Sequence, residues 1–299
     1  MKFRETFFCV IILLFAASCS NNREVKQTGF SIKDDLNNTI SLASIPKRVI
    51  SLAPNLTEMI YDLGQGGSLV GDTKYCDYPE EAKHVAKIGD MLTFNYEKIV
   101  SLKPDLVFIT VAGNTKETYD KFRELGIKIF VSNPTNYAGI KKTYLDLGKI
   151  FGVENEAKLK TAKWDSVVTS ISVESKKYEQ RSAMFLVDLK PAMLAGKNTF
   201  LNEYLTMCGL KNIAESSPMN YPLFSREDIL RVDPDYIIYM AGKDETVSTV
   251  KAAYPEWLQL KAVRKNNIIL VDRDLYPRPG PRFVAALKDL FTRLHPRKK

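Results

Sequence analysis

The sequence predicts an α/β protein with two similar lobes on parallel sheets, joined by one long rigid helix. Short apolar runs that suit buried strands alternate with helical patterns in both halves of the chain. Residues 94–105 are echoed by residues 224–235, with five of twelve positions identical and no gap, which favours two related lobes. Between the halves, residues 154–177 contain neither glycine nor proline and carry apolar residues at helical spacing, so they predict the joining helix.

The first residues are typical of a bacterial secretory signal. An apolar run at residues 7–17 follows two basic residues, and the small residues 16–18 directly precede Cys19. The run is too short to span a bilayer of about 30 Å. A cysteine in this position is typical of lipidation, rather than of a plain signal peptide. We therefore predict a signal peptide over residues 1–18, a lipid-anchored tether over 19–28, and a protein held at the membrane in the periplasm or at the cell surface.

The N-terminal lobe is predicted over residues 29–153. Its expected elements are a hairpin at 30–42, a buried strand at 48–52, a helix at 54–64, and strands at 105–110 and 127–131 around a helix at 116–125. The interdomain helix is predicted over 154–178 and the C-terminal lobe over 179–299. That lobe has expected strands at 183–188, 236–240 and 268–271, and a closing helix that begins at Pro281. Such alternation favours parallel sheets.

Composition argues against several functional classes. The net charge is +8, but the basic residues are scattered except at the last three positions, so we predict no nucleic-acid partner. The two histidines, His84 and His295, lie in a charged stretch and near the C-terminal end, which disfavours an enzyme with a general base and a site for bare zinc or manganese. No nucleophile elbow, phosphate-binding loop or zincin motif is present. We expect no catalytic residue, no metal ligand and no resident cofactor.

The cysteines leave two possibilities. After Cys9 and Cys19 are set aside, Cys76 and Cys208 remain far apart in the sequence. They could form one disulfide in an oxidising compartment. We predict free buried thiols instead, because the two residues fall in different lobes.

A second echo relates two glutamates. Glu58 precedes Gly64 by the same spacing with which Glu203 precedes Gly209, and each glutamate falls in the first turn of an expected helix. Such a residue complements the helix dipole, worth about 0.3–1 kcal/mol. Two equivalent carboxylates on two equivalent lobes could also dock on a symmetric partner.

Several motifs together resemble the periplasmic binding proteins of the iron-siderophore, haem and cobalamin ABC importers, especially the cobalamin-binding branch. In chain order these motifs are residues 46–52, 54–64, Asp77-Tyr78-Pro79, 103–107, 196–213, Ser225-Arg226-Glu227 and Arg278-Pro279-Gly280-Pro281-Arg282. They cover nearly the whole mature chain. The resemblance implies a binding protein that holds its ligand between two lobes, moves little, and delivers it to a permease dimer with its ATPase.

The resemblance also implies roles for individual residues. Glu58 and Glu203 would meet permease arginines. Here the chain departs from the family, whose second acidic residue is expected about one turn later, at Thr206. The cleft would be lined by Pro54, Tyr75, Met91, Phe200, Tyr221, Phe224, Tyr276 and Arg278. For the aromatic residues, core packing is the ordinary alternative. The expected ligand is a corrinoid such as cobalamin; a ferric siderophore or haem is the alternative, with Tyr75 or Tyr276 as a possible axial ligand.

Overall fold

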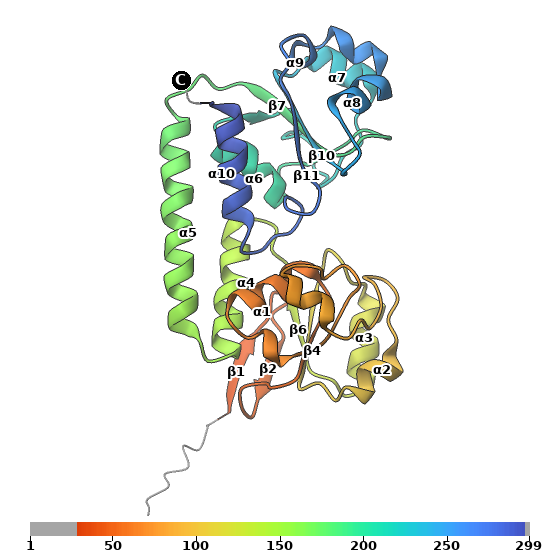
Figure 1. Ribbon diagram of the computed structural model, residues 1–299, viewed down its shortest axis with the longest axis vertical. Coiled ribbons are helices and arrows are strands. Elements are labelled where there is room, and N and C mark those ends of the chain that lie inside the picture. Colours follow the sequence, from red (N-terminus) through yellow and green to blue (C-terminus); the bar gives the residue numbers. More distant parts are fainter. Residues whose placement is uncertain (1–28, 297–299) are drawn as a thin grey trace, which may run out of the picture.

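The computed structural model describes residues 29–296, so the predicted signal peptide, Cys19 and the tether lie outside the described residues. Two α/β lobes are joined along one side by the long helix α5 (Glu154–Ser175), as Figure 1 shows. Helices α4 and α10 pack against α5. The predicted fold class, two lobes with parallel sheets and a long connecting helix, is confirmed. Within residues 29–296, no helix has the length and apolar character needed to cross a membrane.

The N-terminal lobe contains a hairpin and a four-stranded parallel sheet in the order β4-β3-β5-β6. Its elements are β1 (Phe30–Lys33), β2 (Thr39–Leu42), β3 (Val49–Ser51), α1 (Pro54–Asp62), β4 (Leu69–Asp72), α2 (Tyr96–Ser101), β5 (Leu106–Thr110), α3 (Lys116–Glu124), β6 (Ile129–Ser132) and α4 (Tyr137–Ile150), with short 3-10 turns at Gly66–Ser68 and Glu80–His84. Every residue of β5 and β6 is buried, as expected for strands of a parallel sheet that is covered on both faces.

The C-terminal lobe contains a five-stranded sheet in which β11, β10, β7 and β8 are neighbours and β9 pairs with β7. All its pairs are parallel except β7 with β8. Its elements are β7 (Ser182–Asp188), β8 (Met193–Leu194), α6 (Phe200–Met207), β9 (Lys211–Asn212), α7 (Arg226–Val232), β10 (Tyr236–Ala241), α8 (Val247–Ala253), a 3-10 turn at Pro255–Gln259, α9 (Lys261–Arg264), β11 (Ile268–Asp272) and α10 (Phe283–Leu294).

The repeated Pro-Asp pair has the same structural role in both lobes. Asp105 Oδ2 accepts hydrogen bonds from the backbone N–H groups of Lys47 and Arg48, at 2.8 and 2.9 Å, just before β3. Asp235 Oδ2 likewise accepts from the N–H and the hydroxyl of Ser182 at the start of β7. Each aspartate therefore fixes the start of a neighbouring strand, which explains why this part of the repeat is shared.

The largest buried cluster belongs to both lobes. It includes Leu147 of α4, Ile171 of α5, Leu201 of α6 and Leu287 of α10, together with side chains from both sheets. The helices at the connection therefore form a common core rather than a linker between two separate cores.

Both internal cysteines are buried free thiols, as predicted. Cys76 lies in the N-terminal lobe and Cys208 ends α6 in the other. Burial raises the pKa of the Cys208 thiol to about 12, so this thiol stays protonated and unreactive at neutral pH.

Candidate functional site

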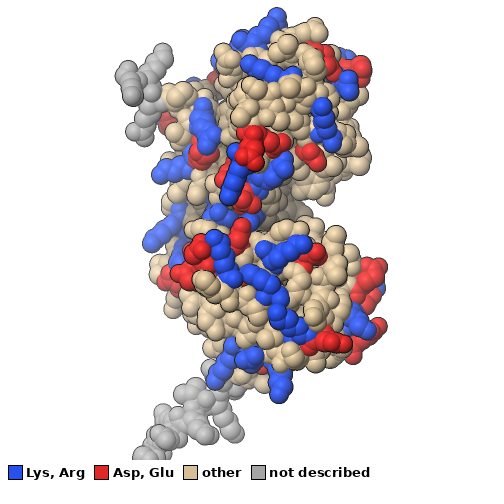
Figure 2. Space-filling view, turned by 45° about the vertical axis from the view of Figure 1, so that its right-hand side comes forward, with Lys and Arg blue, Asp and Glu red and all other residues tan. Residues whose placement is uncertain are grey.

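A cavity of about 510 Å³ lies between the lobes, and the molecular surface is hollowed there (Figure 2). The N-terminal lobe lines it with segments at the carboxyl ends of β3, β5 and β6, at residues 54–55 (the start of α1), 110–113 and 133–135, and with Tyr75 and Met91. The other lobe contributes residues 198–200, 220–221 and 277–279. The carboxyl ends of parallel strands are where open α/β sheets place ligands, so this cleft is the candidate ligand site.

Most of the predicted ligand residues meet in this cleft. They are Pro54, Tyr75, Met91, Phe200, Tyr221 and Arg278. Tyr75 and Tyr221 are 48% and 40% exposed, which is unusual for large aromatic side chains and leaves their surfaces available to a ligand. Hydrogen bonds to Asn114 fix the backbone at Met91. The Asn114 side-chain NH2 donates to the Met91 carbonyl oxygen, and its side-chain oxygen accepts from the N–H of Thr110.

Two predicted cleft residues lie elsewhere. Tyr276 is fully buried, and its ring packs on Tyr204. Its hydroxyl oxygen lies 3.0 Å from Ala286 O and 2.8 Å from Asp289 Oδ2, which share its hydrogen bond as acceptors. Phe224 packs against the second core cluster of the C-terminal lobe and does not line the cleft. Both predictions were wrong. The loop position of Tyr276 suggested a ligand contact, but α10 folds back over this loop and encloses the side chain.

The walls of the cleft are mainly apolar, with polar side chains among them, and they carry little charge. Its polar side chains include four carboxamides, those of Asn55, Asn133, Asn198 and Asn220, and three hydroxyls, those of Thr110, Thr135 and Thr199. Among the described residues that line it, Arg278 alone is charged. Carboxamides both donate and accept hydrogen bonds, so the walls can satisfy a ligand that carries amide groups.

Three carboxylates compensate the positive charge of Arg278. Its Nη1 lies 3.0 Å from Glu58 Oε1 and 2.8 Å from Asp77 Oδ1, and its Nη2 lies 3.5 Å from Asp274 Oδ1. Burial acts to raise the pKa of Asp77, but the hydrogen bond and charge of Arg278 outweigh it, so the pKa lies below its ordinary value. Asp77 is therefore ionised at neutral pH and compensates Arg278.

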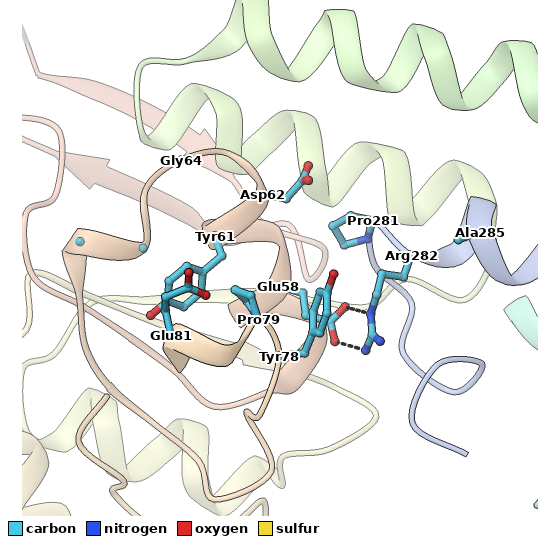
Figure 3. A pocket seen from close by; sticks show the side chains of 12 residues that line it. Glu58, Tyr61, Asp62, Gly64, Tyr78, Pro79, Glu81, Pro281, Arg282 and Ala285 are labelled. Carbon is cyan, nitrogen blue, oxygen red and sulfur yellow. Dashed lines mark hydrogen bonds and ion pairs between the residues drawn. The ribbon is translucent and has the colours of Figure 1, made fainter. Parts of the chain in front are cut away.

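Glu58 connects the two lobes. Its side chain is only 1% exposed, and besides Arg278 it binds Arg282 in a bidentate pair, with Nε–Oε2 at 2.8 Å and Nη2–Oε1 at 2.6 Å (Figure 3). The Arg282 guanidinium in turn covers the ring of Tyr78 at 4.1 Å. Arginines of the opposite lobe thus enclose the Glu58 carboxylate in this structure, and the docking role of Glu58 stays a prediction.

Glu203 makes a reciprocal contact. It lies on α6 of the C-terminal lobe, and its Oε2 accepts a hydrogen bond from the backbone N–H of Tyr137, the first residue of α4 in the N-terminal lobe. A carboxylate there complements the positive end of the helix dipole. Burial raises the pKa of Glu203 although this hydrogen bond opposes the shift. Each of the two matched glutamates thus bonds the opposite lobe.

A second cavity of about 590 Å³ lies on the other side of the Glu58–Arg282 pair (Figure 3). Residues around α1 line it, including Tyr61, Asp62 and Glu81. It contains none of the predicted ligand residues, so we retain the cleft as the candidate site. Within residues 29–296, no three His, Cys, Asp or Glu side chains gather to hold a metal ion.

Sequence reasoning missed Asp77 and Arg282 as members of the site, although both stand in motifs that carry the family resemblance. It also missed the four asparagines. Asparagine is common in loops for its turn chemistry, and only the folded chain shows that these four converge on one cleft.

The fold and the inter-lobe cleft define a class of solute-binding proteins. Residues 49–275 match the family described as periplasmic binding protein, and the chain belongs to this family. Its relatives are transport binding proteins, so the chain is a binding protein of an ABC importer rather than an enzyme.

Three transport binding proteins are similar to this chain over most of its length. The chain is 29% identical to an uncharacterised ABC transporter substrate-binding lipoprotein of Bacillus subtilis strain 168, covering 99% of this chain and 98% of the relative. It is 29% identical to the vitamin B12-binding protein of Photorhabdus laumondii, covering 85% and 90%. The crystal structure of the periplasmic vitamin B12-binding protein of Vibrio cholerae is similar, with a TM-score of 0.73, 25% identity, and coverage of 84% and 97%.

Proposed function

We propose that this chain is a lipoprotein that binds a corrinoid such as cobalamin in the inter-lobe cleft and delivers it to its permease. The observation that carries the proposal is the lining of the cleft, which combines aromatic walls and carboxamides with a single, compensated charge. A corrinoid presents a broad apolar ring system rimmed by amide side arms. Aromatic surfaces suit the former and asparagine side chains suit the latter.

Two relatives add support. Their names state that they bind vitamin B12, and both align with more than four-fifths of this chain. An anionic ferric siderophore fits less well, because a site for such a ligand needs uncompensated cations and the cleft offers none among its described residues.

Haem is the second candidate. The half-exposed phenol of Tyr75 stands in the cleft, and a tyrosine can serve as an axial ligand of haem iron. The acidic propionates of haem would still lack a free cation in the cleft.

Membrane attachment is part of the same proposal. Cys19 follows a small-residue site, and the Bacillus subtilis relative, which aligns with almost the whole chain, is named a lipoprotein. A lipid on Cys19 would keep the binding protein close to its permease and raise the effective concentration for docking.

Calorimetric titration tests the cargo. Residues 23–299, which lack the lipidated cysteine, are titrated with cyanocobalamin, ferrichrome, ferric enterobactin and haemin. We expect tight one-to-one binding of cyanocobalamin alone. Tight binding of haemin instead would establish the second candidate, and binding of ferric enterobactin alone would overturn both. Mass measurement of the full-length protein from membranes tests lipidation, with the Cys19→Ser variant as the control.

A further inference from the structure

Asp77 lies behind the cleft and touches it only through Arg278. Its carboxylate is 2.8 Å from Arg278 Nη1, and this is the one side-chain hydrogen bond that it makes among the described residues. Asp77 itself does not line the cleft. We infer that Asp77, by neutralising Arg278, is a specificity-determining residue that makes the cleft select electrically neutral chelates over anionic ones. The inference rests on the proposed function, because it takes the cleft to be the chelate site.

The charges around Arg278 support this selection. Arg278 and Arg282 are joined to three carboxylates, those of Glu58, Asp77 and Asp274, which leaves the group with one net negative charge. An anionic ligand that reached Arg278 would compete with carboxylates already at 2.8 and 3.0 Å and would be repelled by them. A neutral ligand meets no such penalty.

One cation beside the cleft, Lys74, is also compensated. Lys74 Nζ lies 5.1 Å from the ring centre of Tyr75, but it is paired with Asp90 at 3.3 Å. Cyanocobalamin is neutral overall, since the charges of its metal, ring, cyanide and phosphate cancel. Ferric catecholates and the propionates of haem carry net negative charge, so electrostatics separates the candidate ligands.

Asp77 suits a mutational test better than Glu58. Glu58 is enclosed and holds two arginines across the lobe boundary, so its replacement changes stability as well as charge. The Asp77 side chain is 48% exposed, and its replacement by Asn keeps the shape while removing one negative charge. Arg278 then keeps Glu58 as a partner, and the net charge of the group of Arg278, Arg282 and their carboxylates rises from −1 to zero.

The test compares the affinities of the Asp77→Asn variant for ferrichrome, cyanocobalamin and the trianion ferric enterobactin at about 0.01 M and 0.15 M salt. At low salt we expect ferric enterobactin to bind about tenfold more tightly than to the wild type, and the neutral ligands to change less than twofold. The gain should shrink at 0.15 M salt, where the Debye length falls from about 30 Å to about 8 Å. A merely structural role for Asp77 would not give this dependence on ligand charge and salt.

Three further variants complete the test. Asp77→Glu restores the charge and should restore wild-type selectivity. Asp228→Asn is the matched control: its side chain is 46% exposed and pairs with Arg231 at 2.7 Å, but it does not line the cleft. Asp274→Asn, at an exposed position, should shift selectivity in the same direction more weakly, which keeps the test valid if Asp77→Asn folds poorly.

The outcomes distinguish a failure of the role assigned to Asp77 from a failure of the proposed function. Equal affinity for ferric enterobactin in the wild type and in Asp77→Asn, or an equal gain in Asp228→Asn, overturns the role of Asp77. If the wild type binds no chelate at all, the proposed function itself fails.

Discussion

Arg278 Nη1 lies 3.0 Å from Glu58 Oε1, so a residue that lines the cleft is bonded directly to a glutamate of the opposite lobe. Sequence analysis gave these residues separate roles, ligand contact for Arg278 and permease docking for Glu58. In the structure they belong to one network. Docking through Glu58 therefore requires the arginines to release it first.

We expect Glu58→Gln to destabilise the protein substantially. The change leaves Arg278 and Arg282 partly unpaired in a buried setting, and breaking a buried ion pair costs about 3–5 kcal/mol. Urea unfolding measures the loss. The exposed pair of Glu174 and Lys177 supplies the control, since Glu174→Gln should cost less than about 1 kcal/mol. Similar losses in the two variants would contradict the assigned role of Glu58.

Glu203→Ala should lower the free energy of unfolding by about 1 kcal/mol, because it removes the acceptor for the Tyr137 N–H at the start of α4. Thr206→Ala, one turn later on the exposed side of α6, is the control and should have little effect. If Glu203→Ala leaves stability unchanged but impairs transport, Glu203 acts only in docking.

Substitutions of Tyr276 and Tyr75 should have opposite effects on stability and on ligand affinity. Tyr276→Phe removes the hydroxyl that donates to Ala286 O and to the carboxylate of Asp289, so we expect about 1–3 kcal/mol of lost stability and unchanged affinity. Tyr75→Ala should lower cyanocobalamin affinity about tenfold with little change in stability. Calorimetric titration and urea unfolding of both variants provide the comparison. A loss of affinity in Tyr276→Phe at full stability would place that residue at the ligand after all.

Asp72 should make stability depend on pH near neutrality. It is fully buried beside Lys87, and burial raises its pKa to about 7, with the hydrogen bond and charge of Lys87 opposing the shift. In the unfolded chain the carboxyl releases its proton near pH 3.8, while the folded protein retains it up to about pH 7. The stability contributed by the protonated form is therefore complete below pH 3.8 and is lost as the pH rises through about 7.

The Asp72→Asn variant does not titrate and isolates this effect. Between pH 5 and 7, the free energy of unfolding of the wild type should fall relative to the variant by up to about 1.4 kcal/mol per pH unit, and the difference should level off above pH 8. Asp235→Asn is the control: hydrogen bonds from Ser182 outweigh burial and lower the pKa of Asp235, so its difference should be constant over this range. A constant difference for Asp72→Asn would show that Asp72 is ionised throughout.

The sequence predicted the lobe repeat and many of the strands and helices, because these follow from local patterns, but it did not predict β4 or α4. The Pro-Asp pair, for example, repeats because each aspartate fixes the start of a strand. It also predicted six cleft residues through family motifs. It could not predict the direction of the Tyr276 side chain or the enclosure of Glu58, since both depend on how α10 and its preceding loop return to the rest of the chain. The four asparagines converge only through tertiary structure.

The shared core of α4, α5, α6 and α10 has a consequence for cooperativity. Side chains of both lobes contribute to one buried cluster, so neither lobe can melt without exposing apolar surface of the other. Multidomain chains often unfold in separate steps, but this arrangement favours a single thermal transition. A cut in the segment between α5 and β7 would yield two fragments that each contain part of that cluster, and burial of the cluster should keep them associated. We therefore expect the two lobes to unfold together as one cooperative unit.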